Sequence, residues 1–155
     1  MTDRKSPIDL ENHAKLLMDS YRHWTGKSLI PLESGRSPLE QLERSELVVL
    51  SHGIEDDPIL NYGNAKTLQL WELDWETLTR TPSRLTAESM GQDERAAFMA
   101  RVTRDGYVDN YTGVRISSTG RRFYIKRVTV WNVVDSEGIY RGQAAVFADY
   151  EYVNG

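Results

Sequence analysis

Cysteine is absent from the 155-residue sequence. Its absence excludes disulfides, thiolate zinc sites, iron–sulfur clusters, cysteine nucleophiles and photochemical thiol adducts. The sequence also lacks any apolar run near the roughly 18 residues that a membrane-spanning helix requires. Its polar beginning, MTDRKSPIDLENH, contains no signal-peptide core. These absences favour a cytoplasmic protein without a membrane partner.

Positive charge is also in short supply. Lys and Arg total 19 against 23 Asp and Glu, which leaves a formal net charge of −4. This balance argues against a nucleic-acid partner that is bound by phosphate neutralisation. Hydrophobic residues make up 39% and charged residues 27%, which is typical of a soluble globular domain. The classes that remain are a small enzyme, a small-molecule sensor and an adaptor that binds protein.

The N-terminal region, residues 1–25, has the pattern of an amphipathic helix. Its apolar side chains recur every three or four residues, which places them on one stripe of a helix. The stripe either covers the domain's own sheet or pairs with the same helix of a second subunit. Residues 26–44 contain Pro, Gly and several Ser, which predicts an irregular linker before the main domain, residues 45–153. The stripe consists of Leu10, Ala14, Leu17, Tyr21 and Trp24.

Periodicity within the main domain predicts the α+β class. Two short β-type runs precede several short helices and one longer helix, and three alternating strands follow. We expect one five-stranded antiparallel sheet with these helices on one face and the N-terminal helix on the other. The expected strands are 46–51, 59–62, 107–117, 121–134 and 139–152, and the longer helix is 92–104.

Two long stretches carry a family resemblance. They are SHGIEDDPILNYGNAKTLQLWELDWETLTRTPSRLTAE, from Ser51, and GVRISSTGRRFYIKRVTVWNVVDSEGIYRGQAAVF, from Gly113. With them the chain resembles the MEKHLA domain, a PAS-related family, over Leu16 to Phe147. MEKHLA domains occur as stand-alone bacterial proteins and in plant homeodomain transcription factors. The resemblance implies a PAS-like sensory fold and signal transduction through a ligand or partner. The sequence has no homeodomain, so no DNA-binding role is expected.

The resemblance also implies a mostly apolar ligand cavity between sheet and helices. A hairpin loop at 118–120 pairs Ser117 with Arg121, and strict alternation from there places four candidate side chains on one sheet face. By similarity to flavin-binding PAS domains, that face is the inner one. Two guanidinium groups among aromatic rings would suit a carboxylate or phosphate, unless they pair with acids or face solvent. The candidates are Tyr111, Arg115, Arg127 and Trp131, with Gln143 on the last strand as a fifth.

Cofactor chemistry is constrained by the few histidines. His13, His23 and His52 lie outside the predicted long helix, where haem-binding PAS domains usually carry their ligand, so haem is not expected. Flavin is left open, without adduct chemistry because cysteine is absent. The acidic segment 52–57 matches no known metal loop, so no metal site is expected. The residues expected to stabilise turns are His52, Asp57, Asn61 and Asn64.

Three functions fit this pattern. The first is a PAS-like regulatory module that binds a small molecule, with an anion as the favoured class, and signals through a homodimer or a partner at the N-terminal helix. The second is a ligand-free protein-interaction module with an exposed apolar patch on that helix. An enzyme is the least expected, because no nucleophile accompanies Tyr111, Arg115, Arg127 and His52.

Overall fold

The computed structural model describes residues 7–87 and 89–153, in which short helices separate two leading strands from the remaining ones. The strands are β1 (Val48–His52), β2 (Leu60–Gly63), β3 (Tyr107–Ile116), β4 (Arg122–Val134), β5 (Tyr140–Phe147) and β6 (Asp149–Tyr152). The helices are α1 (Pro7–Thr25), α2 (Pro38–Glu43), α3 (Ala65–Trp71), α4 (Trp75–Leu78), the 3-10 helix η1 (Ser83–Thr86) and α5 (Ser89–Asp105).

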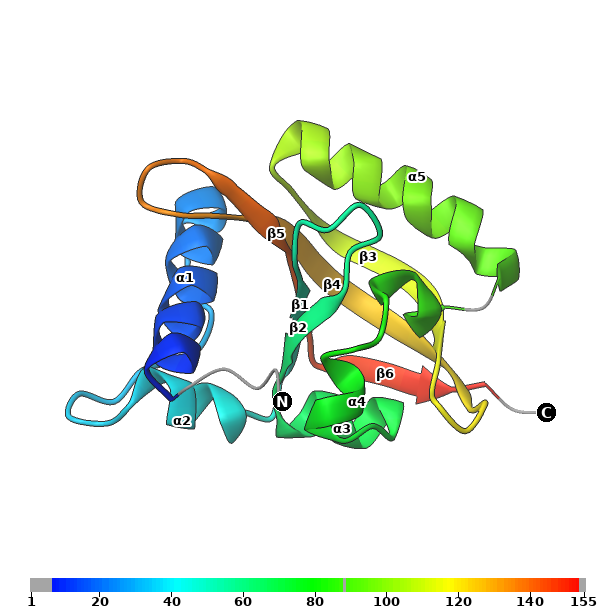
Figure 1. The fold of residues 1–155 in the computed structure, drawn as a ribbon, viewed down its shortest axis with the longest axis horizontal. Helices are drawn as coiled ribbons and strands as arrows, with labels where there is room; N and C mark the ends of the chain where they lie inside the picture. The colour runs from blue at the N-terminus through cyan, green and yellow to red at the C-terminus, as the bar shows by residue number, and fades with distance from the viewer. Residues whose placement is uncertain (1–6, 88, 154–155) are drawn as a thin grey trace.

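The strands form one antiparallel sheet in the order β2-β1-β5-β4-β3, with β6 against β4 (Figure 1). The leading strand β1 pairs with the trailing strand β5, from Val48↔Phe147 to His52↔Gln143. Residues far apart in the chain therefore share one hydrogen-bonded ladder. This pairing confirms the predicted α+β, PAS-like sheet.

The last predicted strand, 139–152, is interrupted and becomes β5 and β6. The register with β4 continues across the break, from Thr129↔Val146 to Lys126↔Asp149. The break lies opposite Arg127, whose φ of 53° takes it out of the extended conformation. A sixth strand thus arises from a local irregularity in its neighbour, not from a separate turn in the chain.

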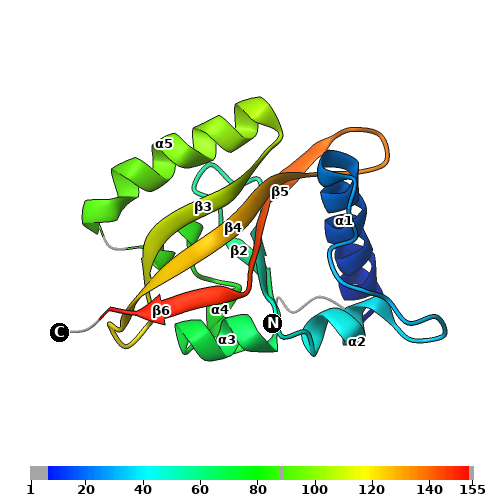
Figure 2. The same cartoon turned by 180° about the vertical axis from the view of Figure 1, so that it is seen from behind.

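Helix α1 covers one face of the sheet, which we call the outer face (Figures 1 and 2). Ala14 and Leu17 are fully buried against it. The indole N–H of Trp24 donates to the main-chain oxygen of Asn132 (2.8 Å), and that of Trp131 donates to Ser20 Oγ (3.0 Å). The apolar stripe of α1 therefore packs on the chain's own sheet, which was the first alternative; the second was pairing with the same helix of a second subunit.

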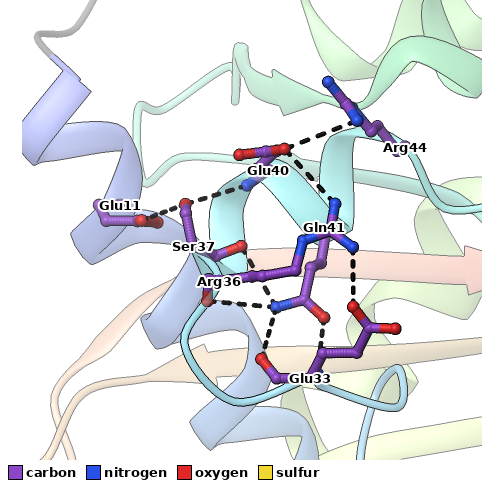
Figure 3. Close-up of polar contacts among 7 residues, drawn as sticks. All are labelled: Glu11, Glu33, Arg36, Ser37, Glu40, Gln41 and Arg44. Atoms are coloured by element: carbon purple, nitrogen blue, oxygen red, sulfur yellow. Dashed lines mark hydrogen bonds and ion pairs between the residues drawn. The ribbon is translucent and has the colours of Figure 1, made fainter.

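The segment predicted as an irregular linker contains helix α2, which the sequence analysis missed. Ser37 caps this helix, and its hydroxyl also donates to the carboxylate of Glu11 on α1 (Figure 3). The Gln41 side chain joins both ends of the preceding loop, since Gln41 Nε2 donates to Glu33 O and Arg36 O (both 3.2 Å). These contacts hold the segment against α1 as part of the fold.

The residues expected to stabilise turns have different roles in the structure. Asn64 is completely buried and caps α3, and its Nδ2 donates to the main-chain oxygens of Leu42 and Leu47. Asn61 lies within β2 and not in a turn, and its Oδ1 accepts from Ser51 Oγ (2.5 Å). Asp57 lies in the β1–β2 loop, where it accepts from Arg84 Nε (3.1 Å). His52 ends β1 and belongs to the site described below.

Helices α3, α4 and α5 cover the opposite face of the sheet, which we call the inner face (Figure 2). Trp71 packs edge-on against Phe123, with ring centroids 5.1 Å apart. Phe98 and Val102 of α5 join the same buried cluster. The space between these helices and the sheet is where a PAS-like fold holds a ligand, and it contains the site.

Candidate functional site

A cavity of about 40 Å³ lies between the inner face and the helices, and we call it the chamber. Most of its wall is apolar. The lining side chains come from several elements and include Leu50 of β1, Trp71 of α3, Met99 of α5, Ile125 of β4 and Phe147 of β5. At roughly 10–15 Å³ for each water-sized group, the chamber has room for about three such groups.

Two arginines from different elements line the chamber. Arg95 comes from α5 and is 9% exposed, and Arg115 comes from β3 and is 6% exposed. Arg95 Nη2 donates to Ser83 Oγ (2.5 Å). Arg115 Nη1 donates to the main-chain oxygen of Val114 (2.8 Å), and Nη2 lies 3.5 Å from the Tyr111 hydroxyl. Every one of these acceptors is uncharged.

The strand geometry of β3 explains how Arg115 reaches this position. Tyr111, Gly113 and Arg115 point to the same face because side chains alternate along a strand. A Cβ at position 113 would lie 2.6 Å from the Tyr111 hydroxyl and 2.9 Å from Arg115 Nη1. The missing side chain thus lets the guanidinium fold toward the tyrosine, whose ring is stacked on Phe98 at 3.8 Å.

No carboxylate balances the two cations within the described part of the chain. The described residues that line the chamber include neither Asp nor Glu. The ion pairs found among the described residues involve other arginines and lysines, and none involves Arg95 or Arg115. Burial, with a further contribution from the Arg115 charge, lowers the pKa of Arg95 to about 10. Its guanidinium nevertheless stays protonated at neutral pH, so the chamber is electropositive.

Two buried N–H groups at the chamber have no hydrogen-bond partner in the described structure. They are Arg95 Nε and Trp71 Nε1. Buried polar groups in folded proteins are nearly always hydrogen-bonded, because an unpartnered one costs about 1–3 kcal/mol. Both are donors that cannot accept a hydrogen bond. The chamber therefore combines positive charge with donors that lack an acceptor.

His52 and Gln143 are two further polar residues of the chamber lining. Gln143 Nε2 is shared among Thr103 Oγ1 (2.9 Å), Asn132 Oδ1 (3.1 Å) and the main-chain oxygen of Met99 (3.2 Å). The cross-strand hydrogen bond, which was the alternative to ligand contact for Gln143, is thus present. Burial is the main cause that lowers the pKa of His52. This histidine was expected only to stabilise a turn, and the structure places it in the chamber wall.

The prediction that Arg127 and Trp131 share the inner face with Arg115 is wrong. The predicted pairs Arg115↔Phe123 and Gly113↔Ile125 are present, but Tyr111 pairs with Val128 and not with Arg127. An extra residue in β4, a β-bulge at Arg127, shifts the alternation by one position. Arg127 is consequently exposed beside Asp149 (2.9 Å), and Trp131 packs under α1 on the outer face.

Arg95 was missed by the sequence analysis, although the pattern contains a signal for it. In the predicted helix 92–104, Phe98 and Val102 mark the apolar face at a spacing of four. Arg95 precedes Phe98 by three residues and so lies on the same stripe. A charged residue on the buried stripe of a helix is a reason to look for a site.

Solved structures place this architecture in a known class. A PAS domain from Colwellia psychrerythraea superposes with a TM-score of 0.61 and 9% identity, over 74% of this chain and 92% of that one. The light-state dimer of the fungal blue-light photoreceptor Vivid superposes with a TM-score of 0.60 and 13% identity, over 96% and 97%. A second fungal LOV-domain photoreceptor gives 0.58 and 16%, over 92% and 91%. The chain therefore has a PAS/LOV-like fold.

The family follows from the sequence itself. The MEKHLA domain model matches residues 11–152, nearly the whole chain. This protein therefore belongs to the MEKHLA domain family. No curated protein matches the sequence at a significant level.

The flavin of photoreceptors with this fold does not fit the chamber. Sites for ligands of drug size occupy about 300–1,000 Å³, and this chamber measures about 40 Å³. The Phe98–Tyr111 stack and Trp71 fill space on the inner face. Haem is likewise too large for a chamber of about 40 Å³. The part of the chain that the structure describes also holds no group of three or more side chains able to bind a metal ion, and none of its helices is long and apolar enough to cross a membrane.

Proposed function

We propose that this MEKHLA domain is a sensory module that binds a small molecule in the chamber and transmits the binding event to a partner or a second copy. The single observation that carries the proposal is the presence of two buried donors without acceptors, Arg95 Nε and Trp71 Nε1, on residues that line the chamber. A ligand with acceptor atoms would supply what these groups lack. The proposed role is binding and not catalysis.

The contacts around Asn132 suggest how binding reaches the surface. Asn132 Oδ1 accepts from Gln143 in the chamber wall, and Asn132 Nδ2 donates to Val102 O (3.1 Å) near the end of α5. The main-chain oxygen of Asn132 accepts from Trp24 of α1. A displacement of Gln143 by a ligand would therefore change the contacts of both α5 and α1. In this proposal α1 acts as the output element.

The alternative of a ligand-free interaction module loses the surface on which it depended. That hypothesis required an exposed apolar patch along the stripe of α1. In the structure Ala14 and Leu17 are fully buried, and Leu10, Tyr21 and Trp24 pack against the same outer-face cluster. We therefore favour ligand binding over an interface made by this stripe.

A variant that fills the chamber tests the proposal. Ala145 lines the chamber from β5, so Ala145→Leu should occupy the space that a ligand needs. Native mass spectrometry of freshly purified protein should show a bound small molecule in the parent and lose it in the variant. Ala97→Leu, at an exposed position of α5, is the matched control and should keep the molecule.

Two results would contradict the proposal. One is a bound molecule that survives Ala145→Leu unchanged, which would place binding outside the chamber. The other is a parent protein that carries no molecule and whose melting temperature does not respond to any member of a metabolite panel.

A further inference from the structure

The two arginines of the chamber, which have no carboxylate partner among the described residues, specify the class of ligand, and this inference rests on the proposed function. We infer that the chamber binds a short aliphatic monocarboxylate, of about two to four carbons, whose carboxylate lies between Arg95 and Arg115 and whose hydrocarbon part contacts the apolar wall. Arg95 is the residue that selects the anion.

Charge is the first step of the argument. Two guanidinium groups share one largely buried space, and neither has a carboxylate partner among the described residues. Buried charges in proteins are normally paired, because an isolated one loses its hydration without compensation. A carboxylate is planar and accepts two parallel hydrogen bonds from a guanidinium, so it offers charge and acceptors together.

Hydrogen-bond donors are the second step. Arg95 directs one nitrogen to Ser83 and leaves Nε unpartnered, and Arg115 directs its nitrogens to Val114 and Tyr111. Trp71 adds another free donor. A ligand that fits this pattern accepts hydrogen bonds and does not need to donate any, which describes an ionised carboxylate and not an amine or an amide.

Size and wall chemistry are the third step. The volume of about 40 Å³ admits about three water-sized groups, which corresponds to acetate and excludes nucleotides and phosphorylated cofactors. Met99 lines the chamber, and its flexible thioether can move to admit one or two further methylenes. Ile125, Val128 and Phe147 are better neighbours for a hydrocarbon tail than for nitrate or bicarbonate, whose every atom is polar or charged.

The same geometry predicts an inverse relation between binding and stability at Arg95. Without an anion, the buried guanidinium faces a second positive charge and has an unsatisfied Nε. Replacing it with an apolar side chain of similar length removes both penalties. A purely structural arginine would instead destabilise the protein when replaced.

Chemical-shift titration tests the inference on the full chain. Acetate, propionate and butyrate are titrated into the parent protein at constant ionic strength, alongside acetamide, propionamide, nitrate and bicarbonate. The indole proton of Trp71, assigned by its loss in Trp71→Phe, reports the arrival of an acceptor. The carboxylates should shift this proton in a saturable way, and they should bind at least tenfold more tightly than the amides and the inorganic anions.

Variants then assign the selectivity. Arg95→Met should lower the affinity for propionate at least tenfold while leaving the melting temperature unchanged or raised. Arg104→Met, an exposed arginine on the same helix, should change neither. Arg95→Lys keeps the charge and should retain part of the affinity, which also covers the case in which Arg95→Met fails to fold.

Each outcome separates this inference from the proposed function. Equal affinity for propionate and propionamide would overturn the carboxylate inference and leave the sensory proposal intact. Tighter binding of nitrate or bicarbonate than of propionate would contradict the claim that the apolar wall contacts a hydrocarbon tail. It would show instead that the site binds inorganic anions. A lower melting temperature in Arg95→Met, with unchanged propionate affinity, would show that the arginine is structural. If Ala145→Leu still binds propionate with unchanged affinity, the binding site lies outside the chamber, and both proposals are wrong about its location.

Discussion

Two indoles on the outer face and two N–H groups on the inner face differ in their hydrogen-bond partners. On the outer face, the indole of Trp131 is paired with Ser20, and the Trp24 indole with the Asn132 main chain. On the inner face, Trp71 and Arg95 keep buried N–H groups without partners. Both faces are covered by helices and bury large aromatic side chains. These four groups therefore differ in whether their N–H has a hydrogen-bond partner.

This contrast indicates that the outer face mainly stabilises the fold and that the chamber on the inner face mainly binds a ligand. A buried donor that has a hydrogen-bond partner, as the Trp131 indole does, leaves no desolvation penalty to set against the packing free energy. A face with unpaired donors and cations gives up part of that energy, and a ligand can restore it on binding. If this division holds, substitutions on the outer face should mainly change stability, and those at the chamber should mainly change binding.

The largest expected effect is on the outer face. Trp131→Ala removes a completely buried indole and its hydrogen bond, and it should lower the free energy of unfolding by about 3–5 kcal/mol in chemical denaturation. Tyr124→Ala is the control, because Tyr124 lies on the same face of β4 but is exposed, and it should cost less than about 1 kcal/mol. Comparable losses for the two variants would break the comparison between the faces.

An intermediate effect should appear in the pH dependence of stability. Burial lowers the pKa of His52 in the folded state below its ordinary value of about 6.5. The unfolded chain then binds more protons, so stability falls as the pH decreases from about 6.5 through the lower folded-state pKa. Arg95 adds to this lowering, while Gly53 O, Gln143 and Glu55 oppose it.

The variant His52→Gln isolates this contribution. Denaturation measured between pH 7 and pH 5 should show a shallower loss of stability in the variant than in the parent. His23→Gln, at an exposed position of α1, should leave the slope unchanged. A parallel slope in His52→Gln and the parent would show that the buried histidine does not titrate against folding.

The smallest effect is expected at Arg127. Its side chain is 79% exposed and forms a surface ion pair with Asp149. Such pairs contribute about 0–1 kcal/mol, so Arg127→Gln should change the melting temperature very little and leave propionate affinity unchanged. Arg115→Gln should lower that affinity, although the two arginines are alike in sequence pattern. If Arg127→Gln loses affinity for propionate, Arg127 lies at the site, as strict alternation along the strand predicted.

Local patterns were sufficient for most of the fold. The spacing of Leu10, Ala14 and Leu17 indicated a helix with one apolar face, and the hairpin at 118–120 set the pairing Arg115↔Phe123. Both features depend on residues within a few positions of one another, and their periodicity reflects backbone geometry directly. The turn at Asn64 belongs to the same group, since its side chain caps the next helix.

The site depended on features that a linear pattern does not contain. Alternation along β4 holds until Arg127 adopts a positive φ, and from that residue onward each side chain changes face. Trp131 left the candidate site for this reason, and Val128 and Val130 entered the chamber wall. Arg95 joined Arg115 because α5 crosses the inner face, a contact between residues that belong to different elements.

The sequence by itself determined the order of the strands and of most helices, the apolar stripe of the N-terminal helix and the exclusion of cysteine chemistry, because each follows from composition or short-range spacing. Only the tertiary structure decided which arginine faces the chamber, how large the chamber is and which donors stay unpaired. Those properties arise from distances between segments far apart in the chain, and a bulge of one residue was enough to move Arg127 and Trp131 out of the predicted site.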